Sequence, residues 1–451
     1  MSRCRYVFSL IERMQLLEAA AELVASGNSL LLASAGQDDF LWLLVAQLHY
    51  SNLLRLATSF LSMAVTRGAQ RDAEYAVHSW HYFSDSIDFQ SFFRFKADEM
   101  ERLFTAFKIP DTLWHVERNG KRRRVDGRHA LTVLLWRLSS GDTLPKINLG
   151  LGRKRTAASR MCCTLLNWLF GRWYRPLFAS DLRRWVPHYP RWAEAVWRKQ
   201  QEAPGAHGRG HRNIVAFIDG NLNEVARPDA LRQEAVYNNQ HKEHGMKFLG
   251  MYGVNGLILD IVGGVEGRHN DQWLLGVGEL AKRWDAHLQW ACTRTMTGVY
   301  NGTPFNVQGS LSWHTPGYIM YGDAGFNLQA HLQVPYKASH GELGPLETEL
   351  NAILSRARIP NEWIFGRMHR LWPVLKQENI MVLGKGYVTK YVIAAAMFTN
   401  AYTCLYGFQG NSYFGVLPPA LEEYLDGAPD EAVCPRPWYE YAAEYEALDP
   451  L

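Results

Sequence analysis

The sequence predicts an α/β fold in which a mixed β-sheet is flanked by helices and preceded by a mostly helical N-terminal region. The first observation is a set of four short apolar runs with glycine punctuation, which is typical of buried strands: IVAFIDG, MKFLGMYGV, LILDIVGGV and YIMYGDAG. The second is the helical spacing of apolar residues in DQWLLGVGELAKRW, between the third and fourth runs, and in the stretches 345–372 and 388–405. Three strands, a helix, a fourth strand and then helices indicate a mixed α/β domain.

The part of the chain before these strands carries a different pattern. Residues 1–118 have apolar residues at helical spacing and few helix breakers, so a helical region is expected there. Residues 119–205 are predicted to form a helix ending at Gly141, a short turn and a longer helix with a basic first turn. This layout is typical of a helix-turn-helix DNA-binding segment, although a helical bundle with a solvated arginine face accounts for it equally well. The candidate DNA contacts at the start of the longer helix are Arg153, Lys154, Arg155 and Arg160.

The charge of the chain is distributed unevenly. The net charge is +4, yet residues 121–212 contain 20 Lys or Arg and 5 Asp or Glu, so this stretch carries +15 and the remainder −11. A basic middle joined to an acidic remainder predicts contact with a polyanion. Hydrophobic residues make up 47% of the 451, which excludes disorder as the default and suits two or three domains. No apolar run predicts a membrane span, and the six irregularly spaced cysteines indicate free thiols in a reducing compartment.

The domain boundaries follow from these shifts in composition. The stretch 201–213, QEAPGAHGRGHRN, lacks periodicity and is the best candidate for a linker. We therefore expect four parts, which are a helical region at 1–118, a basic helix-turn-helix-like region at 119–205, an α/β domain at 206–417 and an acidic tail at 418–451.

Two aspartates lie at the ends of predicted strands. Asp219 ends the run IVAFID and Asp323 follows YIMYG, and a glycine comes within two residues of each. Because burial of an unpaired carboxylate is costly, both are expected to face the mouth of the sheet, where ligands bind in open α/β folds. Two such aspartates on neighbouring strands can share Mg²⁺, which prefers carboxylate oxygens. Taken singly, such an aspartate is more often part of a turn or a helix N-cap.

A third acid lies in the predicted helix LSRARIPNEWIFGRMHRLW. Glu362 has Gly366 four residues later on the same helical face, and a small residue there would let the helix approach the sheet closely. Arginines flank this acid, at Arg358 and Arg367. The arginines alone indicate a salt-bridged surface residue. Phosphate chemistry gives a second interpretation, in which carboxylates hold metal ions and the arginines hold phosphates.

These pieces, in this order, resemble a Harbinger-type transposase of the DDE superfamily of nucleases over residues 130–405. FIDGN is similar to the first aspartate motif of the family, with Asn221 in place of the usual threonine. YGDAGF is similar to the strand-end Gly-Asp-x-Gly-aromatic motif, with Asn327 in place of the usual proline. The remaining matches are a segment with Asp271 beside His269, the helix around Glu362, the closing stretch MFTNAYTC and the helix-turn-helix.

The resemblance implies an RNase H-like core whose acids bind two Mg²⁺ or Mn²⁺ ions. Asp219 would bridge both ions, and Asp323 and Glu362 would each hold one. Asp271 is a rival for the second aspartate because it also lies in a motif of the family. It precedes a predicted helix, however, and can instead cap the N-terminus of that helix. We favour Asp323 by the order of elements and keep Asp271 as a candidate catalytic and metal-binding residue.

The expected function is that of a metal-dependent DNA endonuclease or transposase, which cleaves phosphodiester bonds and joins DNA strands. The alternative is a domesticated, catalytically silent DNA-binding or scaffold protein on the same fold. An α/β hydrolase or nucleotide-binding enzyme ranks last because the chain contains no GxSxG, GxGxxG or P-loop motif. The resemblance also implies a Myb-like accessory partner that assists DNA binding and nuclear entry. We further expect a homo-oligomer, located in the nucleus or also in the cytoplasm. The KRRR run at 121–124 is a nuclear signal, a solvated loop or a phosphate contact.

Overall fold

The computed structural model divides the chain into two units, Met1–Tyr75 and Ala76–Leu451. The residues that the structure describes all belong to the second unit, and they are 80, 89–117, 119–150, 155–178, 182–284, 296–300, 303–307, 317–338, 342–384 and 387–426. The helical prediction for residues 1–88 therefore lies outside the described residues, Trp80 excepted. No helix within the described ranges is long and apolar enough to span a membrane.

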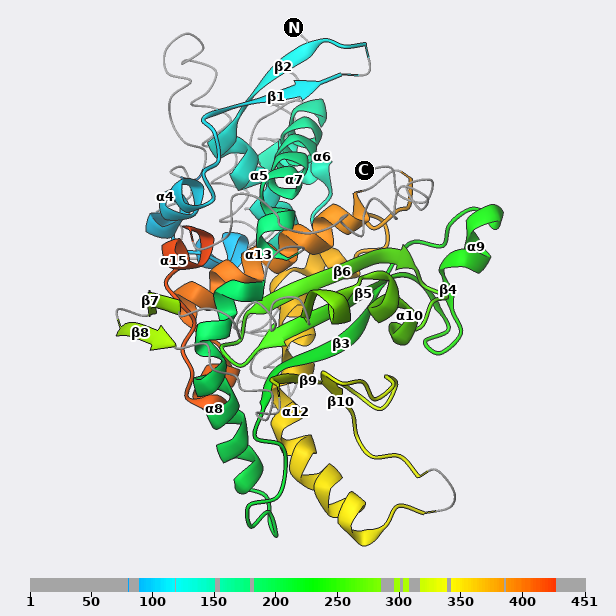
Figure 1. Cartoon of the computed structure of the whole chain (residues 1–451). Helices are drawn as coiled ribbons and strands as arrows, with labels where there is room; N and C mark the ends of the chain where they lie inside the picture. The colour runs from blue at the N-terminus through cyan, green and yellow to red at the C-terminus, as the bar shows by residue number, and fades with distance from the viewer. Residues whose placement is uncertain are drawn as a thin grey trace, which may run out of the picture. The chain divides into compact units, whose positions relative to one another are not determined.

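The described unit is a mixed α/β structure, as the sequence predicted (Figure 1). Its longer helices are α4 Ala97–Ala106, α5 Gly127–Ser140, α7 Arg155–Leu177, α8 Tyr189–Gln201, α12 Pro345–Leu371 and α13 Val388–Tyr406. The shorter helices are α3 Phe89–Phe93, α6 Leu144–Gly150, η2 Leu182–His188, α9 Ala230–Val236, α10 Asp271–Val277, η3 Pro373–Lys376, α14 Gln409–Phe414 and α15 Leu421–Asp426.

The main sheet contains six strands, which are β3 Ile214–Glu224, β4 Tyr237–Asn238, β5 Glu243–Gly253, β6 Ile258–Glu266, β9 Ile319–Tyr321 and β10 Leu332–Gln333. The path runs β10-β9-β3-β5, and β6 and the short β4 both pair with β5. β3 is antiparallel to β5 and parallel to β9, so the sheet is mixed. This arrangement of three sequential antiparallel strands with a parallel fourth beside the first is compatible with the RNase H-like fold that the resemblance implies.

Two further hairpins lie outside this sheet. β1 Thr112–Val116 pairs with β2 Arg122–Asp126, and β7 Met296–Tyr300 pairs with β8 Thr303–Val307, both antiparallel. The first corrects the expectation of a solvated loop at 121–124, because Arg122–Arg124 form ladder pairs with β1. This hairpin also crosses the predicted boundary between residues 118 and 119, and the four-part division of the chain stays a prediction.

The helices of the predicted helix-turn-helix segment form as expected. α5 begins at the Asp126 cap, whose Oδ1 accepts a hydrogen bond from the His129 backbone N–H at 2.9 Å. It ends at Gly141, which takes the left-handed conformation with φ 65° that favours glycine at a helix end. Most of α5 is buried, and the helix packs against α7, which in turn packs against α13. The segment is thus continuous with the core around the sheet.

The core is formed where helices meet the sheet. α13 is buried along nearly its whole length and packs against β6, and α8 and α12 pack against β3. Asn400 of α13 joins the two layers through two hydrogen bonds of 2.8 Å. Its Oδ1 accepts from the Ile258 backbone N–H, and its Nδ2 donates to the Ile258 carbonyl. Gly264 lets α13 approach, since a Cβ there would lie 2.4 Å from Thr389 Oγ1. Four tryptophans of the basic stretch 121–212 are buried, namely Trp173, Trp185, Trp192 and Trp197.

Candidate active site

Asp219 lies in the middle of β3, which corrects the expectation that it ends a strand. The strand continues to Glu224 because residues 216–224 pair with β5 along its whole length, with Asp219 opposite Gly250. The parallel partner β9 ends earlier, at Tyr321, which is opposite Phe217. Asp219 lies two residues beyond this last parallel pair within β3, and Asp323 lies two residues beyond it in the loop that follows β9. The register therefore brings these two predicted acids to the C-terminal end of β9, and both side chains are half-buried.

The electrostatics of Asp219 show which charges share its site. Burial raises the pKa of Asp219 to about 6, against an opposing effect of the Arg358 guanidinium and with further increases from the carboxylates of Asp323 and Asp271. The pKa of the central acid is thus sensitive to both candidate second aspartates. A carboxyl group whose pKa is raised by burial and by like charges is typical of a functional site.

Asp271 reaches the site from the first residue of α10. The expected N-cap role belongs to its neighbour Asn270, whose Oδ1 accepts a hydrogen bond from the Trp273 backbone N–H at 2.7 Å. The Asp271 side chain lies instead against Gly220, where a Cβ would meet its Oδ1 at 2.1 Å. Its Oδ1 is also 3.0 Å from Nζ of Lys247, which is only 4% exposed. This buried lysine fixes Asp271 beside the strand that carries Asp219.

Asp323 is fixed by a turn of its own. Its Oδ1 accepts a hydrogen bond from the Gly325 backbone N–H at 2.7 Å. The loop after it is tied to α10, because the backbone N–H of Asn327 donates to Oε1 of Gln272 at 2.8 Å. This bond links the segment that carries Asp323 to the helix that begins at Asp271.

Helix α12 lies beside the same site. Arg358 of this helix acts on the pKa of Asp219 from one side, and the ring of Phe365 makes an edge contact with Tyr252 of β5, with centroids 5.3 Å apart. Residue 362 lies between them, about one helical turn from each, on the same face of α12. The backbone of α12 therefore places Glu362 at the site, although its side chain lies outside the described residues.

The sequence suggested that Gly366 lets α12 approach the sheet closely, but the structure shows that the approach does not depend on this glycine. Gly366 is exposed, and a Cβ there would meet nothing within 4 Å. The glycine that matters is Gly250 of β5, opposite Asp219, where a Cβ would lie 2.1 Å from the Tyr252 hydroxyl and 3.1 Å from Phe365. The glycine is needed on the strand and not on the helix, because the rings of Tyr252 and Phe365 occupy the space above Gly250.

Tyr252 is a site residue that sequence reasoning missed. Its hydroxyl is buried without a hydrogen-bond partner within the described structure. Burial and the charge of Asp219 raise the pKa of Tyr252 well above its ordinary value, so the phenol stays protonated. In the sequence, only its position two residues after Gly250 could have placed Tyr252 at the site, because residues two apart lie on the same face of a strand.

The predicted DNA-binding arginines have different positions. Arg153 and Lys154 lie outside the described residues, as does the side chain of Arg155. Arg160 of α7 is half-buried and lies close enough to His115 to lower its pKa, after the larger effect of burial. Arg367 is bound inside the protein, since its guanidinium donates to Oγ1 of Thr403 at 3.1 Å and to the carbonyl of Gly407 at 2.6 Å. The sequence predicted that Arg367 contacts DNA. In the structure its guanidinium instead joins α12 to the end of α13.

The donor set around Asp219 suits a hard divalent cation in part. Mg²⁺ needs only one or two carboxylates, with water and substrate phosphate as its other ligands, and Asp219 and Asp323 supply such a pair. Among the described side chains, however, no three His, Cys, Asp or Glu residues converge closely enough to hold an ion. That search did not include the side chain of Glu362. One carboxylate on β3 with a raised pKa, and one in the loop just after the neighbouring strand β9, therefore fit a metal site that is completed by further ligands.

Residues 218–400 match the family model described as DDE superfamily endonuclease. We call these residues the DDE segment; it begins within β3 and ends within α13. It includes Asp219, Asp323, Asp271 and Glu362, so all four predicted acids fall inside the match. The comparisons with curated proteins and with solved structures gave no match. The match supports nuclease chemistry for the DDE segment, in agreement with the coarser part of the sequence prediction.

The raised pKa of Asp219 predicts that this acid destabilises the metal-free protein. A carboxyl whose folded pKa lies above its unfolded value costs stability once the pH rises through the folded pKa, here about 6, and costs nothing below its unfolded pKa. We expect Asp219→Asn to increase the free energy of unfolding by on the order of 1 kcal/mol at neutral pH, and the gain to vanish towards about pH 4.

Urea denaturation across this pH range measures the effect. Glu234→Gln, at an exposed position on α9, is the matched control and should show no such gain. A stabilisation of Asp219→Asn that is independent of pH would contradict the assigned cause.

Proposed function

We propose that the chain is a divalent-metal-dependent DNA endonuclease of the Harbinger transposase type, which cleaves phosphodiester bonds and joins DNA strands. The observation that carries the proposal is the position of Asp219 within the DDE segment. Asp323 follows the neighbouring strand β9, α12 lies beside Asp219, and burial raises the pKa of Asp219. A catalytic site of this class needs acids at these elements and a cation near the scissile phosphate.

The residues of the chain have distinct tasks in this proposal. Asp219, Asp323 and Glu362 would hold the metal ions, and Lys247 keeps Asp271 in place beside Gly220. Arg358, whose Nε is buried without a hydrogen-bond partner in the described structure, pairs with a phosphate oxygen of DNA. Mg²⁺ or Mn²⁺, when bound, activates the attacking water or DNA hydroxyl and stabilises the leaving oxygen. The protonated Tyr252 phenol can donate a hydrogen bond beside Asp219.

The wider assignments rest on the resemblance and on the charge of the chain. We propose that Arg153, Lys154, Arg155 and Arg160 contact DNA, in keeping with the +15 balance of residues 121–212. We also propose a Myb-like accessory partner, a homo-oligomer and a nuclear location.

The test is nicking of supercoiled plasmid by the purified protein with Mn²⁺ or Mg²⁺, beside the same reaction with EDTA. We expect open-circular product only with the metal and only from the protein with Asp219 intact. Equal nicking by the wild type and Asp219→Ala would refute the assigned site. Tight, salt-dependent DNA binding without any metal-dependent nicking would select the alternative of a catalytically silent DNA-binding protein.

A further inference from the structure

The β1–β2 hairpin has one face that packs on the protein and one that does not. Leu113 and Val125 are opposite each other and are 4% and 3% exposed, and Nδ1 of His115 lies 3.1 Å from Oγ1 of Thr164 on α7. These residues belong to the inner face, because alternate residues of a strand point to opposite sides. The inner face thus attaches the hairpin to α7.

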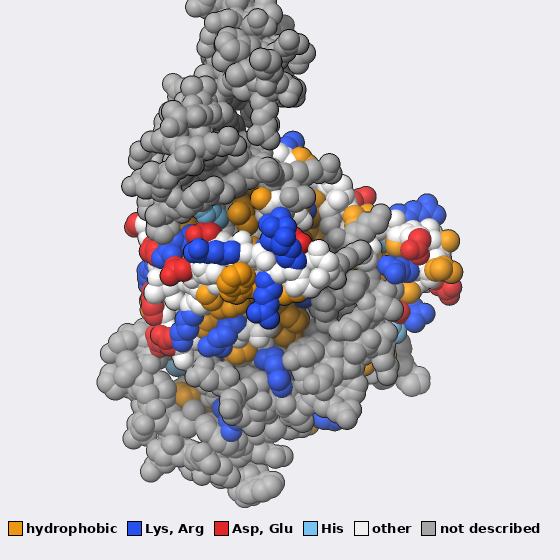
Figure 2. All heavy atoms as spheres, turned by 90° about the horizontal axis from the view of Figure 1, so that it is seen from above, with side chains coloured by type: hydrophobic (Ala, Val, Ile, Leu, Met, Phe, Trp, Pro, Cys, Tyr) orange, Lys and Arg blue, Asp and Glu red, His pale blue; other side chains and the backbone are white. Residues whose placement is uncertain are grey.

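The outer face exposes a large aromatic side chain among arginines. Trp114 is 58% exposed and pairs across the ladder with Arg124, and Val116 is 60% exposed and pairs with Arg122. Both arginines are exposed. An exposed indole beside an exposed Val116 and two arginines forms an apolar patch rimmed by charge, which is typical of an interaction site. Figure 2, seen from the side on which the hairpin lies in Figure 1, shows Lys and Arg side chains around hydrophobic ones.

The hairpin and its surroundings carry a positive charge. On the outer face, Arg122 makes no ion pair among the residues described. On the inner side, Arg123 pairs with Glu117 at 3.0 Å, and Arg160 of α7 acts on the pKa of Glu117 and of His115. The charge complements a polyanion and not a neutral or basic protein surface.

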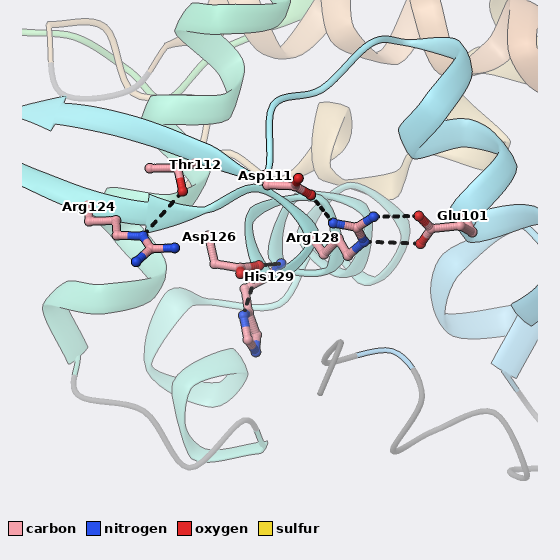
Figure 3. Close-up of polar contacts among 7 residues, drawn as sticks. All are labelled: Glu101, Asp111, Thr112, Arg124, Asp126, Arg128 and His129. Carbon is pink, nitrogen blue, oxygen red and sulfur yellow. Dashed lines mark hydrogen bonds and ion pairs between the residues drawn. The ribbon is translucent and has the colours of Figure 1, made fainter. Parts of the chain in front are cut away.

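The root of the hairpin is held firmly (Figure 3). Arg128 binds Glu101 of α4 through two hydrogen bonds, of 3.1 and 2.6 Å, and also pairs with Asp111. At the strand ends, Nε of Arg124 donates to Oγ1 of Thr112 at 3.2 Å. These bonds order the strands before any ligand binds, so little conformational entropy is lost on binding.

We propose that the outer face of the hairpin binds a single-stranded stretch of DNA, with Trp114 stacked on an unpaired base and Arg122 and Arg124 paired with phosphates. An exposed aromatic ring beside cationic groups is the combination that single strands use, because each base offers a π-face and each nucleotide a charge. A base inside a duplex is already stacked on both sides, so the indole favours the unpaired strand. The proposal rests on the proposed function only in taking DNA as the nucleic acid.

The test is fluorescence anisotropy of the full-length protein with a labelled single-stranded oligonucleotide of about 16 nucleotides, and with its duplex. We expect Trp114→Ala to weaken binding of the single strand about tenfold and to leave duplex binding within about twofold, with Trp114→Phe close to wild type. Arg122→Gln and Arg124→Gln should each reduce the slope of log K against log salt by about 0.7 on the single strand.

Exposed residues elsewhere supply matched controls. Leu231→Ala, at 94% exposure on α9, and Arg198→Gln, exposed on α8, should leave single-strand affinity unchanged. Unaltered melting temperatures of the hairpin variants verify that they fold. Wild-type affinity of Trp114→Ala for the single strand, or an equal loss on single strand and duplex, would overturn the proposal.

Failure of this inference and failure of the proposed function are separable. Metal-dependent nicking by the wild type, with single-strand affinity that does not depend on Trp114, would leave the function standing and refute the hairpin site. Single-strand affinity that does depend on Trp114, without nicking by any form, would support the hairpin site and refute the function.

Discussion

Asp323→Asn is expected to lower metal-dependent plasmid nicking by about a thousandfold or more, as is Asp219→Asn. Each substitution removes a charged oxygen ligand of the metal. A loss of a few kcal/mol of transition-state stabilisation lowers the rate by several powers of ten. Asp271→Asn is expected to lose only about 10- to 100-fold, because Asp271 is held by Lys247 and acts by positioning the site.

The dependence of the nicking rate on Mn²⁺ concentration distinguishes these roles. Substitution of a positioning residue should raise the Mn²⁺ concentration that gives the half-maximal nicking rate. High Mn²⁺ should not restore nicking by Asp323→Asn. Lys247→Met is the companion variant, and it should resemble Asp271→Asn. If Asp271→Asn is as inactive as Asp219→Asn while Asp323→Asn still nicks, Asp271 is the second metal-binding aspartate.

Arg283→Met is expected to destabilise the protein by about 3–5 kcal/mol, since it leaves a buried carboxylate without its partner. Asp260 of β6 is 1% exposed, and its Oδ2 accepts from the Arg283 guanidinium, which also donates to the carbonyl of Gly278 at 3.2 Å. Burial already raises the pKa of Asp260 to about 6, against the opposing effect of Arg283.

The pH dependence of this loss has a definite sign. Without Arg283 the folded pKa of Asp260 rises further, so the variant takes up a proton on folding, and its stability falls as the pH rises. Urea denaturation at about pH 5 and about pH 8 should therefore show the larger loss at the higher pH. The double variant Arg283→Met with Asp260→Leu should recover most of the stability. A loss that the second substitution does not relieve would show that Arg283 acts through other contacts.

The order of strands and helices was predictable from the sequence because it depends on local periodicity. The four apolar runs became β3, β5, β6 and β9, and the helix after the third run became α10. The short elements were missed, since the two residues of β10 and the hairpin β1–β2 carry no periodic apolar signal. The basic run at 121–124 looks like a loop in isolation, and only the pairing of Arg122–Arg124 with Trp114–Val116 makes it part of a strand.

The sequence by itself determined the candidate acids, with Asp323 and Asp271 as rivals for the second aspartate, and the elements that carry them, because Asp219, Asp323 and Glu362 each follow or lie in a strongly patterned segment. Only the tertiary structure decided what surrounds them. The contact of Asp271 with Gly220 depends on packing between α10 and the sheet, and that of Tyr252 with Gly250 on the backbone of β5 and the approach of α12. The same is true of Arg367, whose partners lie 36 and 40 residues further along the chain. The contacts of Asp271 with Gly220, of Phe365 with Tyr252 and of Arg367 with its partners join segments far apart in sequence, and no local pattern of residues encodes them.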